Sequence, residues 1–331
     1  LSDATSNGND GTINGATWST DAPSTEVTNI SLSFDGVDDF VEVTDNSSLN
    51  GTNISIGTWF SIEDLDYPGN SEGQVLVSKW GDDSEGYNNQ RSYRVYYEKV
   101  DSQPKISFII SSDGSVQENN YVITTSSKSI EVQNWHMTIG TYDGDSLKLY
   151  LDGTLVGSTN FSKGIYYGDQ NPPIRFGRKS DHDGMYLNGN LDEVAIWDTA
   201  LTADEVSTLY GSGSVVDASA NSGSYVSSSN LKGYWKMNEG TGTTLSDATS
   251  NGNDGTINGA TWKPQVSSVT SSTSDGSFKI GDEINITVNF SEAVTLSGGN
   301  LNINLETGNT DRQVTISSIS SATSASGTYT V

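Results

Sequence analysis

The chain has 331 residues, of which 33% are hydrophobic, 35 are glycine and none is cysteine. Its 42 acidic and 16 basic residues give a formal net charge of -26, and this charge repels phosphate backbones and anionic lipid headgroups. We therefore expect no nucleic-acid partner and no membrane insertion, and no apolar run approaches the roughly eighteen residues of a membrane span. The lack of cysteine excludes a disulfide framework and thiolate metal sites.

From Ser31 to about residue 200, apolar and polar side chains alternate, and this pattern predicts antiparallel strands with one buried face. The pairs Asp143-Gly144 and Asp152-Gly153 stand where hairpins turn, because glycine tolerates positive φ and aspartate bonds its own backbone. The fold class that we predict is all-β. The strands are expected in SLSFDGVDDFVEV, ISIGTWFSI, QVLVSKW, SYRVYYEKV, KISFIIS, YVITTSS, WHMTIGTYDGDSLKLYLDGTLVGS, IRFGRKS and LDEVAIWDTAL.

One short helix is expected after these strands. Thr202 is followed three residues later by Glu205, ahead of Val206 and Leu209, which is the pattern of a capping box at a helix N-terminus. Residues 211–230 are small and polar, so they predict a loop or a crossing linker.

The sequence LSDATSNGNDGTINGATW occurs twice without change, at residues 1–18 and at residues 245–262. The second copy follows GYWKMNEGTGTT, and the first has no such segment before it. Beyond Trp262 the composition shifts to shorter strands, among them INITVNF and LNINLE, as in an immunoglobulin-like sandwich. About sixty-five residues are too few for a complete sandwich of that type, so residues 263–331 are expected to be an incomplete repeat.

Five segments resemble the bacterial laminin-G-like, concanavalin A-like jelly-roll family. They are GYWKMNEGTGTT, SNGNDGTINGATW, SLSFDGVDDFVEV, WHMTIGTYDGDSLKLYLDGTLVG and LDEVAIWDTALTADEVSTLY, and together they reach across residues 1–262. The stretch KIGDEINITVNFSEAVT more weakly resembles the Ig-like or cadherin-like repeats of large surface adhesins. The resemblance implies a concanavalin A-like jelly-roll sandwich followed by a partial Ig-like β-sandwich.

The order of these segments differs from the family order, in which the YWKMNEG strand comes first and the FDG strand follows the repeated stretch. A jelly roll that lacks a central strand exposes unpaired backbone groups and core side chains. We therefore hypothesise that residues 233–240 return to close the domain of residues 19–262. Residues 1–18 then either lie beside the FDG strand or belong to a preceding repeat.

Acidic residues offer candidate calcium ligands, because calcium takes six to eight oxygen ligands from carboxylates and carbonyls. Asp35 lies in FDGVDD with two further aspartates, and Asp192 lies in LDEV. The family resemblance implies a structural calcium between the outer strand and the DEV strand, which matches Asp192 and either Asp35 or Glu239. We take these three residues as the predicted ligands.

Loops rich in aromatic and amide side chains are candidates for binding a glycan, because sugar CH groups stack on rings while hydroxyls need paired donors and acceptors. The loops at residues 80–93, 165–171 and 182–186 carry such side chains. The predicted glycan-binding residues are Trp80, Tyr87, Asn89, Arg91, Tyr167, His182 and Tyr186.

Other aromatic residues are interpreted as structural. Trp59, Trp135 and Trp197 lie in the strand pattern and are expected in the core, as is Trp262 with its counterpart Trp18. His136 follows Trp135 and is expected to be partly buried and hydrogen-bonded.

Catalysis is not expected. Retaining glycoside hydrolysis needs two carboxylates about 5–5.5 Å apart, and related laminarinases place them on an E-x-D-x-x-E strand. No such string occurs in the chain.

We interpret the chain as a non-catalytic, extracellular or cell-surface adhesion module, cut from a large multi-repeat bacterial surface protein. Its expected partners are a glycan or surface polymer and the neighbouring tandem repeats. Two alternatives stay open. One is a purely structural repeat of a fibre or stalk linked by strand complementation. The other is a carbohydrate-binding module of a glycoside-active enzyme.

Overall fold

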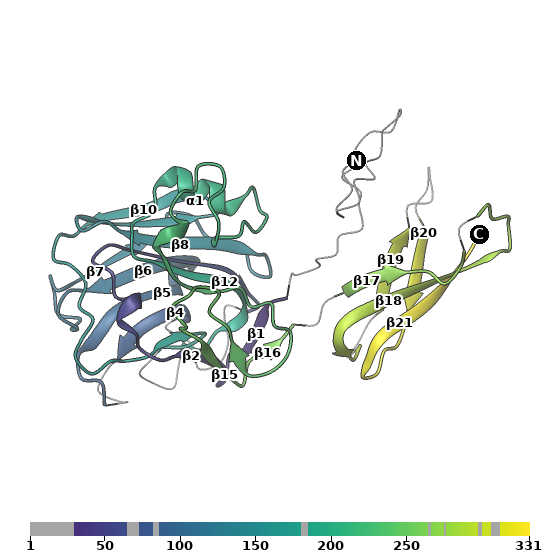
Figure 1. The fold of residues 1–331 in the computed structure, drawn as a ribbon, viewed down its shortest axis with the longest axis horizontal. Helices are drawn as coiled ribbons and strands as arrows, with labels where there is room; N and C mark the ends of the chain where they lie inside the picture. Colours follow the sequence, from purple (N-terminus) through teal and green to yellow (C-terminus); the bar gives the residue numbers. More distant parts are fainter. Residues whose placement is uncertain are drawn as a thin grey trace, which may run out of the picture.

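The structure is a computed structural model that describes residues 30–64, 73–81, 86–179, 185–263, 266–274, 276–296, 300–305 and 312–331. Two large antiparallel sheets form a jelly-roll sandwich between residues 30 and 263, as the predicted fold class requires (Figure 1). Among the described residues no helix is long and apolar enough to span a bilayer.

The first sheet has eight strands. Their order is β10 (Thr154–Asn160), β9 (Ser146–Leu151), β8 (His136–Tyr142), β3 (Ile54–Ile62), β12 (Asn188–Trp197), β1 (Leu32–Asp35) and β16 (Thr261–Trp262), with β13 (Leu231–Trp235) also paired to β12.

The second sheet also has eight strands, and the main hydrophobic core lies between the two sheets. The order is β14 (Thr244–Leu245), β15 (Gly255–Asn258), β2 (Phe40–Val43), β11 (Ile174–Phe176), β4 (Gln74–Gly81), β5 (Gln90–Val100), β6 (Gln103–Ser111) and β7 (Tyr121–Thr125).

The edge of β12 is shared by two strands that lie end to end. β1 pairs with the first half of β12, where Leu32 is opposite Leu191, and β13 pairs with the second half, where Trp235 is opposite Val194. The other edge of β12 is covered by β3. A strand from the end of the domain therefore occupies the same sheet position as the first strand of the described chain.

The Trp235 side chain is fully buried, which is the placement that the closure hypothesis requires. Its Nε1 donates to the Asn253 carbonyl oxygen at 2.8 Å, and its ring meets Phe176 edge-on at 5.0 Å. The second copy of the repeated sequence continues the closure, because β15 pairs with β2 and β16 pairs with β1. Residues 1–18, the first copy, lie outside the described residues.

Local signals in the sequence match the local structure. The hairpins β8–β9 and β9–β10 turn at the two Asp-Gly pairs, with φ of +97° at Gly144 and +72° at Gly153. Helix α1 (Ala203–Tyr210) is capped by Thr202, whose side chain accepts from the Glu205 amide while the Glu205 side chain accepts from the Thr202 amide. The predicted hairpins and capping box are confirmed.

Helix α1 covers the outer face of the first sheet, beside β10 and β8 (Figure 1). Leu209 and Tyr234 belong to a second hydrophobic cluster there, which also contains Trp59 and Trp197. Two 3-10 turns, η1 (Ser47–Leu49) and η3 (Ser228–Asn230), lie in the connections.

The core placement predicted for three tryptophans is confirmed and that for one is wrong. Trp59, Trp197 and Trp262 are buried, whereas Trp135 is 45% exposed because it lies in the connection before β8 rather than in the strand. His136 is half-buried and its Nδ1 lies 2.8 Å from Asp152 Oδ2, so its predicted environment is confirmed.

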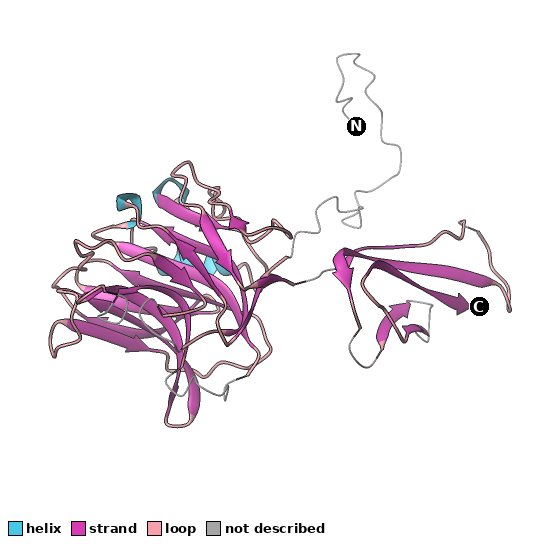
Figure 2. Ribbon diagram, turned by 90° about the horizontal axis from the view of Figure 1, so that it is seen from below, coloured by secondary structure: helices cyan, strands magenta, loops and turns pink. Residues whose placement is uncertain are grey.

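The chain after Lys263 forms two small antiparallel sheets (Figure 2). One contains β17 (Val266–Thr270), β18 (Glu283–Val294) and β21 (Ala322–Thr330), and the other contains β19 (Leu301–Leu305) and β20 (Arg312–Ile316). The Ig-like character of this segment and the domain limits given above stay predictions.

Candidate functional site

Three loops meet at one end of the second sheet, and Gly114 lies at their meeting point. A β-carbon at Gly114, where φ is +82°, would lie only 1.7 Å from the Asn89 carbonyl oxygen and 2.7 Å from Tyr166 Cε1. Glycine has no β-carbon, and its absence at this position lets three loops approach one another closely. The loops are residues 86–91, 112–120 and 164–173.

Hydrogen bonds fix the same loops. Arg91 Nη1 donates to Asn89 Oδ1 at 3.2 Å and to the Gly114 carbonyl at 3.3 Å. The buried amide of Gln90 bridges to the third loop, since its Nε2 donates to Asp169 Oδ1 at 3.2 Å and its Oε1 accepts from the Asp169 amide at 3.0 Å. The loop backbone is thereby held in one arrangement.

Rings, amides and one guanidinium are left accessible on this end. Tyr87, Arg91 and Tyr166 are half-buried, and Asn88, Asn89 and Asp169 are exposed. We call these six residues the rim surface. Half-exposed rings beside fixed polar groups are the combination that a polyhydroxylated ligand needs, because it presents both CH faces and hydroxyls.

The structure therefore brings together three of the predicted glycan-binding residues, Tyr87, Asn89 and Arg91. Trp80 and Tyr186 are only 3% and 7% exposed, and the Arg94 guanidinium lies 5.1 Å from the Trp80 ring centre. Both rings therefore pack inside the protein in this structure, and the glycan contact predicted for them stays a prediction.

The other two predicted glycan-binding residues, Tyr167 and His182, do not belong to the rim surface. Tyr167 donates its hydroxyl to the Gly51 carbonyl at 2.7 Å, and burial raises the pKa of that hydroxyl well above its usual range. Its ring lies 5.5 Å from Nζ of the buried Lys79. The prediction for His182 falls on a segment outside the described residues.

A polar hollow lies near the 3-10 turn η1. It has a volume of about 430 Å³ and contains Lys232, whose Nζ forms an ion pair with Asp198 at 3.0 Å. Its described lining holds serine, threonine, asparagine and glycine besides this pair, and no aromatic ring. The hollow lacks a stacking face for a sugar ring, which the rim surface offers.

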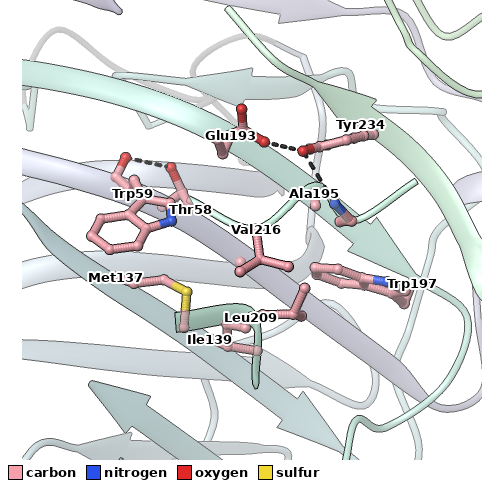
Figure 3. Close-up of a pocket in the computed structure, with 12 residues that line it drawn as sticks. Thr58, Trp59, Met137, Ile139, Glu193, Ala195, Trp197, Leu209, Val216 and Tyr234 are labelled. Carbon is pink, nitrogen blue, oxygen red and sulfur yellow. Dashed lines mark hydrogen bonds between the residues drawn. The ribbon is translucent and has the colours of Figure 1, made fainter. Parts of the chain in front are cut away.

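A pocket under helix α1 is too small for a sugar. Its volume is about 20 Å³, room for about one water molecule. Trp59, Met137, Leu209 and Val216 line it, as Figure 3 shows.

Glu193 closes one side of this pocket with its carboxylate bonded to the Tyr234 hydroxyl (Figure 3). It lies in a bulge where β12 and β3 slip register between Asp192 and Ala195, and its φ is +53°. Burial raises the pKa of Glu193 to about 7, although the Tyr234 hydroxyl and the Lys236 ammonium favour its ionised form.

Asp192 is 8% exposed and lies on β12 between Leu191, the last residue that pairs with β1, and Val194, the first that pairs with β13. Burial, and then the charge of Glu193, raise the pKa of Asp192 to about 9. A carboxylate in this position is costly unless a proton or a cation neutralises it.

The chain leaving β13 adds two buried oxygen atoms without a hydrogen-bond partner, Asn238 Oδ1 and Glu239 Oε2. Glu239 Oε1 accepts from the Ser246 amide at 2.8 Å. Because calcium prefers amide and carboxylate oxygens, Asp192, Asn238 and Glu239 offer donor atoms suited to that ion. Asn238 is a candidate that the sequence prediction did not include, and the signal that could have pointed to it is its place beside Glu239 in YWKMNEG.

The third predicted ligand, Asp35, lies elsewhere. Among the described residues, Asp35, Asp38 and Asp39 form the one group of three acidic or histidine side chains whose ligand atoms lie within 4.8 Å of one another. Two of its carboxylates accept local amides, since Asp39 Oδ2 bonds the Asp35 amide at 2.9 Å and Asp35 Oδ1 bonds the Val37 amide at 2.8 Å. This acidic group contains neither Asp192 nor Glu239.

Residues 35–207, more than half of the chain, match the family model Laminin_G_3, described as the concanavalin A-like lectin/glucanases superfamily. The chain belongs to this family. The residues of the match include the rim surface and Asp192, whereas Asn238 and Glu239 lie beyond it.

Similar solved structures have low sequence identity to the chain. A "putative carbohydrate binding protein" of Bacteroides ovatus has a TM-score of 0.50 at 15% identity, over 71% of this chain and 59% of its own. The SAP-like pentraxin of Limulus polyphemus has a TM-score of 0.41 at 15% identity, over 56% of this chain and 83% of its own. Among curated proteins, human adhesion G-protein coupled receptor D1 is 38% identical over 69 residues, which are 20% of this chain and 8% of the receptor.

The raised pKa of Asp192 predicts a pH-dependent stability in the absence of divalent cations. Between the unfolded pKa near 4 and the folded pKa of about 9, the unfolded chain has released a proton that the folded chain keeps. The stabilisation is therefore fully present below about pH 4 and is lost as the pH rises toward 9, by up to about 1.4 kcal/mol per pH unit for one group.

Urea unfolding in EDTA from pH 4 to pH 9 measures this slope. Asp192→Asn should reduce the slope, whereas Glu118→Gln, which changes an exposed carboxylate, should leave it unchanged. An unaltered slope in the Asp192 variant would show that this carboxyl does not titrate as described.

Proposed function

We propose that the chain is a non-catalytic carbohydrate-binding module that holds an extracellular glycan on its rim surface. The observation that carries the proposal is the meeting of three fixed loops that present Tyr87 and Tyr166 beside Arg91 and Asn89. Membership of a family of lectins and glucanases supports the glycan as ligand class, as does the shared fold of the Bacteroides ovatus protein.

Adhesion is the role that we propose for this binding. A rigid sandwich that carries its ligand groups on loops at one end can hold a surface polymer while other modules of the same polypeptide act as spacers. The surplus of acidic residues suits an uncharged or cationic polymer better than a polyanionic one. We further propose that the module belongs to a large multi-repeat bacterial surface protein.

Retention on insoluble polysaccharides and on a glycan array tests the proposal. Tyr87→Ala and Arg91→Ala should each weaken binding about fivefold or more, since a stacked ring or a charged hydrogen bond is worth about 1–3 kcal/mol. Trp135→Ala, at an exposed ring outside the rim surface, and Lys232→Ala, in the polar hollow, serve as controls that keep binding.

Two results would contradict this assignment. Binding that is lost in Lys232→Ala but kept in both rim variants would move the site to the polar hollow. Unchanged binding in all four variants would show that neither the rim surface nor the polar hollow binds the glycan. Thermal unfolding of each variant checks that a loss of binding does not reflect a loss of fold.

We also propose that Asp192, Asn238 and Glu239 hold a structural calcium ion. The proposal rests on a buried carboxyl with a raised pKa on β12, and on two buried oxygen atoms without partners in the segment that follows β13, the strand paired to β12. The ion would neutralise Asp192 and bind together two segments that are far apart in the sequence.

Calcium should raise the melting temperature Tm by several degrees at millimolar concentration, because extracellular sites bind at about 10⁻⁴ to 10⁻³ M and a ligand stabilises the state that binds it. Asp192→Asn and Asn238→Ala should abolish this rise, whereas Asp38→Asn should keep it. If Asp38→Asn abolishes the rise and Asp192→Asn does not, the ion lies at the Asp35 group instead. Differential scanning calorimetry with calcium, magnesium or EDTA provides the measurement.

A further inference from the structure

Lys79 has a basic side chain that is fully buried. It lies on β4, and its Nζ donates to a carboxylate oxygen of Asp45 and, at 2.9 Å, to Asn50 Oδ1. We propose that this cluster is a modification site, at which the Lys79 amine and the Asn50 carboxamide condense into a covalent amide bond within the chain. The inference rests on the contacts around Nζ, on the chemistry of the three groups and on the polar hollow beside Asn50.

The turn η1 holds both partners of the lysine. Asp45 precedes this turn, and Asn50 caps its C-terminal end with a backbone amide that donates to the Ser47 carbonyl at 3.2 Å. The next residue is also fixed, because the Gly51 carbonyl accepts from the Tyr167 hydroxyl at 2.7 Å. The carboxylate and the carboxamide therefore reach the same nitrogen atom from two fixed points of one short segment.

The surroundings of Nζ favour the uncharged amine, which is the nucleophilic form of lysine. The Tyr167 ring centre lies 5.5 Å from Nζ. Tyr93 is also fully buried, and burial, followed by the nearby Tyr167 and Asp45, raises the pKa of its hydroxyl. Burial likewise lowers the pKa of Lys79, although the bond to Asp45 favours the ammonium form. A buried lysine of this kind can act as a nucleophile near neutral pH.

The condensation forms the bond between Lys79 Nζ and Asn50 Cγ and breaks the bond between Cγ and Nδ2. Asp45 first accepts a proton from the Lys79 ammonium, and the neutral amine then attacks the carbonyl carbon. Asp45 next passes its proton to Nδ2 and takes another from Nζ, so that ammonia leaves. The ion pair and the carboxamide become a secondary amide, a protonated Asp45 and one ammonia molecule, which balances atoms and charge.

The polar hollow gives ammonia a path to solvent. Asn50 lines this hollow of about 430 Å³ together with Ser47 and Gly51, so it separates the buried lysine from an open space. Escape of ammonia drives the condensation forward. The burial of Lys79 keeps away the water that would hydrolyse the new bond.

The bond ties the two sheets together. Lys79 belongs to β4 in the second sheet, whereas Asn50 lies in the connection that enters β3 in the first sheet. The closed ring spans residues 50–79 and contains the whole of β3. A covalent link of this kind constrains the unfolded chain, as a disulfide does, in a protein that has no cysteine.

Mass spectrometry of the full chain, denatured after purification, tests the bond. The measured mass should be lower than the sequence mass by one ammonia molecule. Trypsin gives a second readout, because Lys79 is the first basic residue of the chain and Arg91 is the next. A free Lys79 gives the fragments 1–79 and 80–91, whereas a condensed Lys79 resists cleavage and leaves residues 1–91 as one fragment.

Two variants separate the proposed bond from other losses of ammonia. Asn50 precedes Gly51, and such a pair can also lose ammonia by closing a succinimide ring on its own backbone. Lys79→Arg leaves that pair intact but removes the amine, so the ammonia loss should disappear. Lys232→Arg changes another lysine that lines the polar hollow and is the matched control, in which the loss and the resistance to trypsin should both remain.

Cleavage after Glu63 locates the bond, because it should leave the peptide that contains Asn50 joined to the one that contains Lys79. A full sequence mass together with tryptic cleavage after Lys79 would overturn the proposal. Loss of one water molecule instead of ammonia would also overturn it, since Asp45 would then be the group that condenses. So would an ammonia loss that persists in Lys79→Arg, which would identify the succinimide.

Discussion

The edge of β12 is the constraint on which the sandwich depends. One half of that edge is covered by β1 and the other half by β13, which comes 196 residues after the end of β1 at Asp35. Without β13, the second half of β12 would have backbone amides and carbonyls without partners, and the core beside it would be open to solvent. The closing segment then supplies β14, β15 and β16, so that both sheets are completed by residues 231–262.

The core contribution of this segment is comparable with the stability of a whole domain. It places six side chains in the main cluster: Trp235, Met237, Leu245, Ile257, Ala260 and Trp262. Burial of a large apolar side chain is worth roughly 1.5–3 kcal/mol, so the set contributes on the order of 10 kcal/mol, against a net stability of about 5–15 kcal/mol for a typical domain. The same segment carries Asn238 and Glu239, so the proposed calcium site is complete only when the domain is closed.

Much of this fold could be predicted from the sequence, because its signals are local. Asp-Gly pairs mark hairpins by their backbone preferences, and the Thr202–Glu205 pair marks a helix start by the hydrogen bonds that it makes. The candidate site was harder, because an aromatic residue in a strand pattern looks the same whether its ring is buried or exposed. Trp80 and Tyr186 were expected to contact a glycan and are buried, whereas Trp135 was expected in the core and is exposed.

The central claim is that residues 231–262 are an integral part of the sandwich, and two truncated chains test it most directly. The first truncated chain, residues 30–263, contains the closing segment but lacks residues 1–18 and the C-terminal sheets. The second, residues 30–230, lacks the closing segment as well. Calorimetry should show one sharp, cooperative transition for residues 30–263 and none for residues 30–230. A sharp transition at the same temperature in residues 30–230 would contradict the account.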